Sequence, residues 1–436
     1  MKRLILTIGF FIQFCSHILF AEQIVREFRF GDAKKDRNVI FLRAAQAYRD
    51  TQGYGFEFST EKNVSINQKN KTLLSEKPFY FAVKVPEGNY RVTITYSGLK
   101  NKSYNSTIRS ESRRLHIENQ QVQPKQSLEK NFIVNIKDPK ISSGGIVGLK
   151  KPREQQKLDW DDKLTLEFQQ TNCISMIRIE SINVIPTIFL AGNSTVVNQE
   201  DEPWASWGQM IPRFFDAGIA IANHAESGLA LSSFLSSRRL TKILSIAKPG
   251  DYLFIEFGHN DQKEKGENAG AYKGYSERLR YFVSEFRAKG GIPVILTSTA
   301  RRSFDEQGHL VHTLGDFPDA ARKVAVELQV PLIDLNKKTS IFYEALGVEA
   351  SKSAFVHYPA HTFPNQQNDL ADNTHFNAYG AYEIAKMVLM GIKENKLSIL
   401  GNIVDFDVYD PHYPDDFKAW YWPPSLINSV VKPDGN

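Results

Sequence analysis

The apolar positions of this chain follow two different periods, one in each half. From Ile24 to about Ile185, apolar and polar residues alternate, as they do in Tyr90–Tyr96. A period of two is typical of half-buried β-strands, and no convincing amphipathic helix interrupts it. Many short strands separated by polar turns predict an all-β sandwich domain over residues 22–186.

Two local expectations belong to this half. The apolar segments Phe79–Val85 and Tyr90–Tyr96 are separated only by Pro86–Asn89, which predicts a hairpin. The stretch Ser97–Ser112 is polar, and we expect it to form a loop.

After Thr187 the pattern changes to short apolar runs that alternate with helical segments. The expected helices are Tyr275–Lys289, Phe317–Leu328 and Asn377–Lys393, which carry apolar residues at three- and four-residue spacing. Continuous apolar strands with helical crossovers predict a three-layer α/β domain over residues 187–400, built on a parallel five-stranded sheet. Residues 401–436 are rich in Pro, Asp and aromatic residues and are expected to pack as an irregular strap. The predicted strands are Thr187–Ala191, Ile219–Ala222, Tyr252–Phe257, Pro293–Thr297 and Pro331–Leu335.

The N-terminus predicts export. A basic start, Met1–Arg3, precedes the apolar run Leu4–Phe14, and a small residue follows at Ala21. This pattern predicts a signal peptide over residues 1–21, cleaved after Ala21, and a mature chain without a membrane span in the periplasm or outside the cell. An uncleaved anchor and lipid attachment at Cys15 are the alternatives, although bulky Phe14 disfavours the latter.

Cysteine usage and charge narrow the function classes. The mature chain keeps only Cys173, so it has no internal disulfide, and a buried thiol there is favoured over a nucleophile. Apolar residues make up 42% of the chain and charged residues 24%, which excludes a disordered or coiled-coil protein. The formal net charge of +5 over 436 residues is too dilute to indicate nucleic acid binding.

Polar residues that could carry chemistry follow the predicted strands. Three blocks come directly after strands, namely Gly192–Thr195, Asn223–Gly228 and Gly258–Asp261, and a fourth, Asp372–Phe376, precedes the last helix. In an open parallel sheet, ligands bind beyond the carboxyl ends of the strands. Each block alone is a weak signal, but their joint occurrence in this order predicts one site.

The residue types in these blocks fit serine hydrolysis without metal or cofactor. A free hydroxyl such as Ser194 is a poor nucleophile and needs a base, which His375 can supply. Asp372 lies three residues earlier, so a helical turn or a tight loop could bring its carboxylate to the other imidazole nitrogen. The oxyanion would be held by the backbone N–H groups of Ser194 and Gly228 and by the side-chain amide of Asn260.

These blocks resemble those of the SGNH, or GDSL-type, hydrolases, and within them the rhamnogalacturonan acetylesterases. The resemblance covers roughly residues 187–395. It implies a flavodoxin-like sheet, removal of acetyl groups from pectic polysaccharide, and the roles given above for Ser194, His375 and Asp372. One residue departs from the pattern, because the family usually has Asp where this chain has Asn193. That difference puts the positioning of the serine in doubt, not the reaction class.

The first half is similar to galactose-binding-like modules that precede such esterases. This similarity rests on pattern, including the segment Tyr48–Glu57, which could equally be a turn between strands. Whether the sandwich binds sugar stays open, and so does the oligomeric state.

Several other residues have two interpretations each. His259 could line the pocket or make a structural hydrogen bond, Trp204 could stack on a sugar or pack against the sheet, and Arg301 could meet an acidic substrate or lie solvated at the surface. His357 and His361 have the spacing of metal ligands, but Pro359 between them favours a loop.

The leading hypothesis is a secreted serine carbohydrate esterase that deacetylates plant cell-wall rhamnogalacturonan through an acetyl-Ser194 intermediate. One alternative keeps the mechanism but acts on xylan or another acetylated glycan, since specificity lies in loops. The other is a catalytically inactive carbohydrate-binding protein, against which the complete set of site residues argues.

Overall fold

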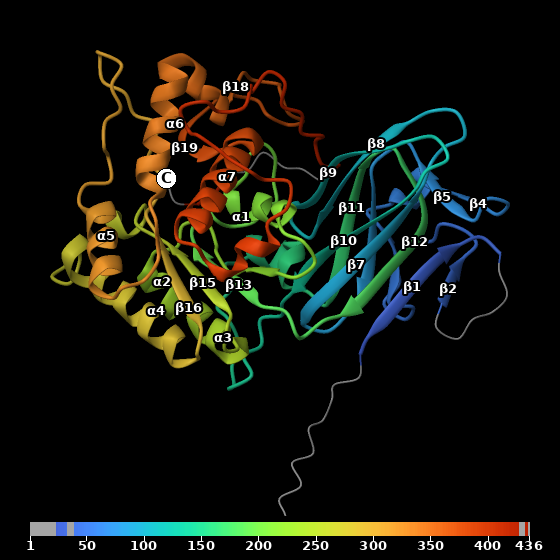
Figure 1. The fold of residues 1–436 in the computed structure, drawn as a ribbon, viewed down its shortest axis with the longest axis horizontal. Helices are drawn as coiled ribbons and strands as arrows, with labels where there is room; N and C mark the ends of the chain where they lie inside the picture. The colour runs from blue at the N-terminus through green and yellow to red at the C-terminus, as the bar shows by residue number, and fades with distance from the viewer. Residues whose placement is uncertain (1–22, 33–38, 427–431, 435–436) are drawn as a thin grey trace, which may run out of the picture.

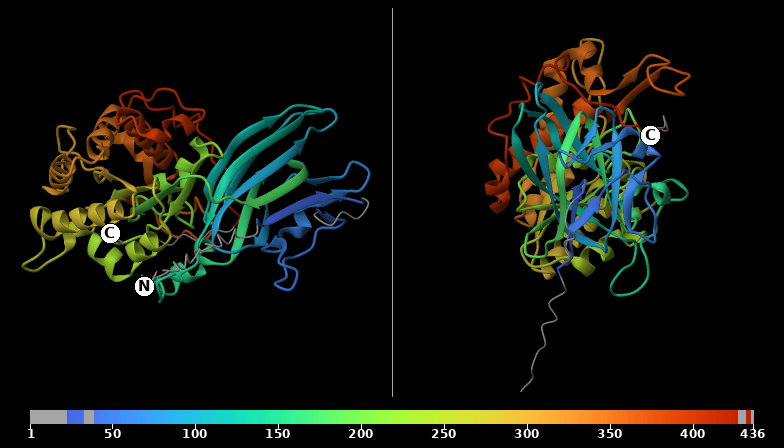
Figure 2. Two further views of the ribbon diagram at one scale, coloured as in Figure 1. Left: turned by 60° about the horizontal axis from the view of Figure 1, so that its bottom comes forward. Right: turned by 90° about the vertical axis from the view of Figure 1, so that its right-hand side faces the viewer.

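A computed structural model describes residues 23–32, 39–426 and 432–434 (Figure 1). The predicted signal peptide, with Cys15 and the cleavage point at Ala21, lies outside the described residues. Two bodies lie side by side, a β-sandwich and an α/β domain, as the further views in Figure 2 also show.

The predicted all-β sandwich is confirmed, and its core lies between two sheets whose strands are mainly antiparallel. One sheet has seven strands: β1 (Val25–Phe30), β2 (Val39–Leu42), β4 (Ser65–Asn67), β5 (Thr72–Ser75), β7 (Gly88–Ser97), β10 (Ser127–Ile136) and β12 (Asn172–Ser181). The other has five: β3 (Tyr54–Glu57), β6 (Phe79–Lys84), β8 (Tyr104–Ser110), β9 (Arg114–Val122) and β11 (Lys163–Gln170).

The predicted hairpin is wrong, because β6 and β7 belong to different sheets. β6 pairs with β3 and β11, whereas β7 pairs with β10 and β12. The chain passes from one sheet to the other between Lys84, where β6 ends, and Gly88, where β7 begins. Both arrangements bury one face of each strand, and alternation alone therefore does not separate them.

The predicted loop Ser97–Ser112 is wrong over Tyr104–Ser110, which form strand β8. The polar side chains of β8 are buried and find polar partners. Ser106 Oγ donates to Asn172 Oδ1 over 2.6 Å, and the guanidinium of Arg109 lies 3.5 Å from the ring centre of Trp422 in the C-terminal tail. A polar strand thus becomes an interior strand once its hydrogen bonds are satisfied.

The α/β domain has the predicted parallel five-stranded sheet. Its strand order is β14-β13-β15-β16-β17, and every neighbouring pair is parallel. Residues along each strand are buried on both faces, which explains the continuous apolar runs in the sequence. The strands are β13 (Thr187–Gly192), β14 (Ala220–Asn223), β15 (Tyr252–Glu256), β16 (Ile292–Leu296) and β17 (Leu332–Ile333).

Helices cover both faces of this sheet and complete three layers (Figure 1). On one face, α1 (Trp207–Met210), α6 (Leu335–Ala350) and α7 (Ala378–Glu394) pack against Leu190, Phe254 and Leu296. On the other face, α2 (Leu231–Ser236), α3 (Arg239–Ile246), α4 (Ser276–Ala288) and α5 (Phe317–Glu327) pack against Phe189, Ile255 and Ile295. The three predicted helices are α4, α5 and α7.

Shorter elements connect these layers. β18 (Phe355–Tyr358) and β19 (Leu370–Phe376) form an antiparallel hairpin that the sequence did not predict. Among the described residues, no helix is both long enough and apolar enough to cross a bilayer. Short 3-10 helices lie at Thr60–Asn63, Arg153–Gln156, Leu158–Trp160, Ile211–Phe214, Asp261–Lys263, Ser351–Ala354 and Ser398–Asn402, and a π-helical turn at Ala271–Tyr275.

Two segments tie the bodies together. The tail after the last helix lies between the two bodies, because the Trp422 ring lies 3.5 Å from the Arg109 guanidinium of the sandwich and its Nε1 donates to Glu202 Oε1 of the α/β domain over 3.0 Å. The connection between β10 and β11 reaches from the sandwich to the α/β domain. Its Lys157 Nζ lies 2.8 Å from Glu226 Oε2 in the α/β domain. The edge of the α/β domain is therefore built by both halves of the chain.

Candidate active site

Ser194, His375 and Asp372 form one hydrogen-bonded chain of side chains. Ser194 Oγ lies 2.9 Å from His375 Nε2, and His375 Nδ1 lies 2.8 Å from Asp372 Oδ2. All three side chains are buried. Ser194 follows β13, whereas Asp372 and His375 lie within β19, so a strand rather than the expected turn or loop carries the acid and the imidazole.

Both oxygens of the Asp372 carboxylate have hydrogen-bond partners in this arrangement. Its Oδ1 accepts the backbone N–H groups of Thr374 (2.9 Å) and His375 (3.0 Å), which leaves Oδ2 for the imidazole. Burial alone would raise the pKa of Asp372, but the hydrogen bonds and the charge of His375 outweigh burial and hold that pKa below its ordinary value. Asp372 is therefore ionised at neutral pH.

Asn193 shapes the turn that presents Ser194. Its Oδ1 accepts from Thr195 twice, from the backbone N–H over 3.1 Å and from Oγ1 over 2.9 Å. An Asp side chain would offer the same acceptor, so this turn does not depend on the difference from the family pattern. The Nδ2 of Asn193 is buried and has no hydrogen-bond partner within the described part of the chain.

Three strand-end loops that bear the candidate oxyanion donors are linked to one another. Gln199 Nε2 donates within the first loop, to the carbonyl of Ser194 over 2.8 Å. The N–H of Glu226 links the second loop to the first by donating to the carbonyl of Gly192 over 3.3 Å. Asn260 Nδ2 donates to the carbonyl of Leu229 over 3.1 Å. A primary amide has two N–H groups, so Asn260 retains a second donor for a ligand.

Gly228 lies at a point that favours glycine. Its φ is +77°, a conformation that side chains rarely adopt. A Cβ there would stand 2.8 Å from Lys150 Nζ and 2.9 Å from Asp434 Cβ. The backbone at Gly228, a candidate oxyanion donor, is thus approached closely by the first domain and by the C-terminal tail.

Asp261 accepts a hydrogen bond from the end of the loop that carries Gly228. Its Oδ1 accepts the N–H of Leu231, the first residue of α2, over 2.9 Å. Burial raises the pKa of Asp261 to about 7, although this hydrogen bond acts in the opposite direction. The fold therefore holds a proton on this carboxyl group that the unfolded chain releases near pH 4.

Asp261→Asn is expected to reduce the fall in the free energy of unfolding that the wild type shows as pH rises above about 4. Between about pH 4 and 7 the unfolded wild type loses a proton that the folded state keeps, so its free energy of unfolding falls as pH rises. Asn keeps the acceptor for Leu231 and never ionises. We expect chemical denaturation to show a gain of at least about 1 kcal/mol at pH 8 and a smaller difference at pH 4. Exposed Asp407→Asn is the control, and an equal difference at both pH values would contradict the assignment.

Two of the three weaker substrate candidates are buried in this structure. Trp204 is 2% exposed, which favours packing over stacking on a ligand. The same is true of Trp207, whose Nε1 donates to buried Glu256 Oε2 over 2.6 Å. His259 is also buried, and burial together with the charges of Arg301 and His375 lowers its pKa to about 3, so it is neutral.

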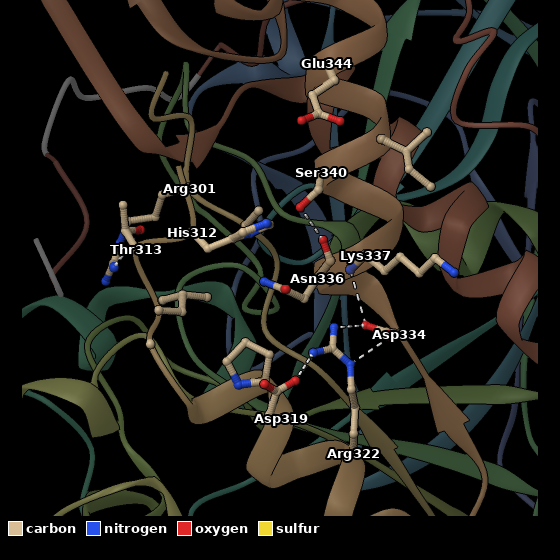
Figure 3. A pocket seen from close by; sticks show the side chains of 15 residues that line it. Arg301, His312, Thr313, Asp319, Arg322, Asp334, Asn336, Lys337, Ser340 and Glu344 are labelled. Atoms are coloured by element: carbon tan, nitrogen blue, oxygen red, sulfur yellow. Dashed lines mark hydrogen bonds and ion pairs between the residues drawn. The ribbon is translucent and has the colours of Figure 1, made fainter. Parts of the chain in front are cut away.

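Arg301 lies at a different pocket. It is half-buried and donates to Gln262 Oε1 over 3.0 Å and to the carbonyl of His259 over 3.4 Å. It also lines a pocket of about 520 Å³ whose walls do not include Ser194 or His375 (Figure 3). Arg301 therefore binds loops together instead of lying solvated at the surface.

The two histidines with the spacing of metal ligands lie on different elements. His357 lies in β18 and its Nε2 lies 2.8 Å from Asn373 Oδ1, whereas His361 follows in the loop. No group of three or more His, Cys, Asp or Glu residues that could hold a metal occurs among the described residues.

Comparison with known proteins gives the family. The model of the GDSL-like lipase/acylhydrolase family matches residues 190–382. Over 219 residues the chain is 44% identical to the rhamnogalacturonan acetylesterase RhgT of Bacillus subtilis. The aligned residues make up 50% of this chain and 94% of that relative. The chain belongs to the GDSL-like lipase/acylhydrolase family. Like other members of this family, it is a carboxylic ester hydrolase.

One relative aligns with the first half of the chain as well. The uncharacterized esterase YxiM of Bacillus subtilis is 23% identical over 398 residues, which is 87% of this chain and 93% of that relative. Its crystal structure covers 86% of this chain and 99% of its own, with a TM-score of 0.46 and 22% identity.

Sequence reasoning missed the residues of the first half that support this site of a GDSL-like enzyme. Lys157 lies 2.8 Å from Glu226, and Glu154 lies 2.5 Å from Arg239 in a pair with fully buried side chains. In the second half, Arg302 Nη1 donates to Asn373 Oδ1 over 2.9 Å, next to Asp372. Apart from the basic run Lys150–Arg153, nothing in the sequence signals these contacts.

Proposed function

We propose that this chain is a serine esterase that removes acetyl groups from a pectic polysaccharide, rhamnogalacturonan. The observation that carries the proposal is the buried chain Ser194–His375–Asp372 beside the Gly228 loop. The choice of substrate is supported by the 44% identity to RhgT, a rhamnogalacturonan acetylesterase, over 94% of that relative.

The proposed reaction has two halves. Ser194 Oγ attacks the acetyl carbonyl carbon while His375 Nε2 takes the hydroxyl proton, and the sugar hydroxyl then leaves with that proton. Water attacks acetyl-Ser194 with His375 again as the base, and acetate and free Ser194 are formed. Asp372 keeps the proton on Nδ1, so Nε2 is free to accept one, and the carboxylate stabilises the imidazolium.

Asn260→Ala is expected to reduce kcat/KM for an aryl acetate by about 10²–10³, because one preorganised oxyanion donor is lost. The effect should appear in kcat rather than in KM, since the negative charge develops only in the transition state. Asn268→Ala is a matched control on an exposed residue of the following loop. Equal rates for the wild type and Asn260→Ala would remove Asn260 from the oxyanion site.

Acetate release from a panel of acetylated glycans tests the substrate. The proposal expects kcat/KM for acetylated rhamnogalacturonan to exceed that for acetylated xylan and acetylated homogalacturonan by at least about tenfold. Equal or faster release from xylan would contradict the pectic substrate and favour the xylan alternative. Binding of the glycans without any acetate release would favour the inactive carbohydrate-binding alternative.

We also propose that the chain is exported, on the basis of the basic and apolar pattern of residues 1–21. N-terminal sequencing of the protein recovered from the periplasm or the medium should begin after Ala21. Recovery of the full chain from the cytoplasm alone would contradict export.

A further inference from the structure

A lysine of the first domain reaches the loop that carries Gly228. Lys150 lies in the connection between β10 and β11, and its Nζ donates to the carbonyl of Ser227 over 2.5 Å. The same Nζ lies 2.8 Å from the position that a Cβ on Gly228 would take. A positive charge from the sandwich half is thus held at the edge of the candidate oxyanion site.

Buried contacts hold the backbone at Lys150 in place. The N–H of Lys150 donates to Glu154 Oε2 over 2.9 Å, and the same oxygen lies 2.5 Å from Arg239 Nη2 of α3. The side chains of Glu154 and Arg239 are fully buried. Because this ion pair anchors the connection to the α/β domain, Lys150 is a fixed part of the site and not a loose surface residue.

Lys150 already forms a salt bridge with a carboxylate of this chain. Asp434 Oδ2 lies 3.1 Å from Lys150 Nζ, and its side chain is 59% exposed. Two residues earlier, Lys432 Nζ lies 3.6 Å from Asp372 Oδ2, and Pro433 between them is buried. The tail segment Lys432–Asp434 therefore spans the distance between the triad carboxylate and the Gly228 loop.

The geometry points to a carboxylate-binding subsite at Lys150, with Asp434 in the place of a substrate uronate. We infer that Lys150 binds the carboxylate of a galacturonate residue adjoining the acetylated sugar, and that this carboxylate displaces Asp434 from Lys150. This inference rests on the proposed function and names Lys150 as the residue that recognises the acidic sugar. Within the described residues, the only salt bridge of Lys150 is the one to Asp434, so a carboxylate ligand would replace an existing pair and bury no unpaired charge.

A binding measurement tests the subsite without depending on catalysis. Calorimetry on the full chain would compare an unacetylated rhamnogalacturonan oligosaccharide with the same oligosaccharide whose uronate carboxyls have been reduced. The wild type is expected to bind the acidic form about tenfold more tightly. Lys150→Gln should lose most of this preference, Lys150→Arg should restore it, and Asp434→Asn, which removes the competing carboxylate, should tighten binding severalfold.

Lys151→Gln is the matched control, because it removes the same charge from an exposed neighbour. An unchanged preference in Lys150→Gln, an equal loss in Lys151→Gln, or no binding of the acidic form by the wild type would overturn the inference. Acetate release is measured separately on the acetylated oligosaccharide. Lys150-dependent binding without any acetate release would contradict the proposed esterase while leaving the carboxylate subsite supported.

Discussion

Ser194→Ala is expected to reduce kcat for hydrolysis of an aryl acetate by about 10⁴-fold or more, because no other group takes the place of the nucleophile. Only the oxyanion donors and substrate binding remain, and their residual rate enhancement sets the background. The Ser194 side chain is small and, among the residues that the structure describes, hydrogen-bonds only to His375 Nε2, so the fold should persist. Initial rates measure the effect, and thermal melts check folding.

Cys173→Ala is the control for this substitution. Cys173 lies in β12 within the sandwich core, and burial raises the pKa of its thiol, which disfavours the nucleophilic thiolate. Its activity should equal that of the wild type. A Ser194→Ala protein that retains more than a few per cent of the wild-type rate would contradict the serine mechanism.

Asp372→Asn is expected to reduce kcat by about 10³–10⁴-fold without unfolding the chain. The Oδ1 that accepts the two backbone N–H groups would remain, while Nδ2 would replace Oδ2 opposite the imidazole. An amide N–H there favours the tautomer with the proton on Nε2, and that nitrogen can no longer accept the proton of Ser194. Rates at pH 7 and pH 9 measure the loss.

Asp369→Asn makes the same change three residues earlier on the same hairpin, at an exposed side chain, and should leave the rate unchanged. Its Oδ1 accepts the N–H of Ala360 over 2.7 Å, and Asn preserves that contact. If Asp372→Asn were as active as Asp369→Asn, Asp372 would be a structural residue and not the partner of the imidazole.

The parallel sheet was predictable because its strands are buried on both faces. Runs such as Ile188–Ala191 and Leu253–Phe257 carry almost no polar residue, since alternate side chains enter different cores. The same topology brings strand ends to one edge, so polar residues placed after the strands had to lie near one another. This is why motifs nearly two hundred residues apart could be grouped from sequence.

Buried strands that contain polar residues could not be predicted from the pattern of apolar positions. Strand β8 contains Ser106, Thr107 and Arg109, and its burial depends on partners that lie far along the chain. Arg109 donates to the carbonyl of Pro423 over 2.6 Å, a contact across more than three hundred residues. Periodicity reports which residues are apolar, and it contains no information on which polar residues find distant partners.

The contribution of the first half to the site was unpredictable for the same reason. The strand-end motifs belong to the α/β half, but Lys150 and Lys157 come from a polar connection between two strands of the sandwich. Lys157 pairs with Glu226, two residues before Gly228, and thereby supports the loop that carries the glycine. A connection of this kind shows no hydrophobic period, so only the folded arrangement reveals its role.

Covalent trapping of the nucleophile is the most direct test of the central claim. The wild type would be treated with an aryl organophosphonate that reacts with activated serine hydroxyls, and the adduct would be located by peptide mass spectrometry. The account predicts one adduct, on Ser194, formed in proportion to the loss of esterase activity and absent from the His375→Ala protein. Complete inactivation with the adduct on another residue, or full activity with Ser194 modified, would contradict it.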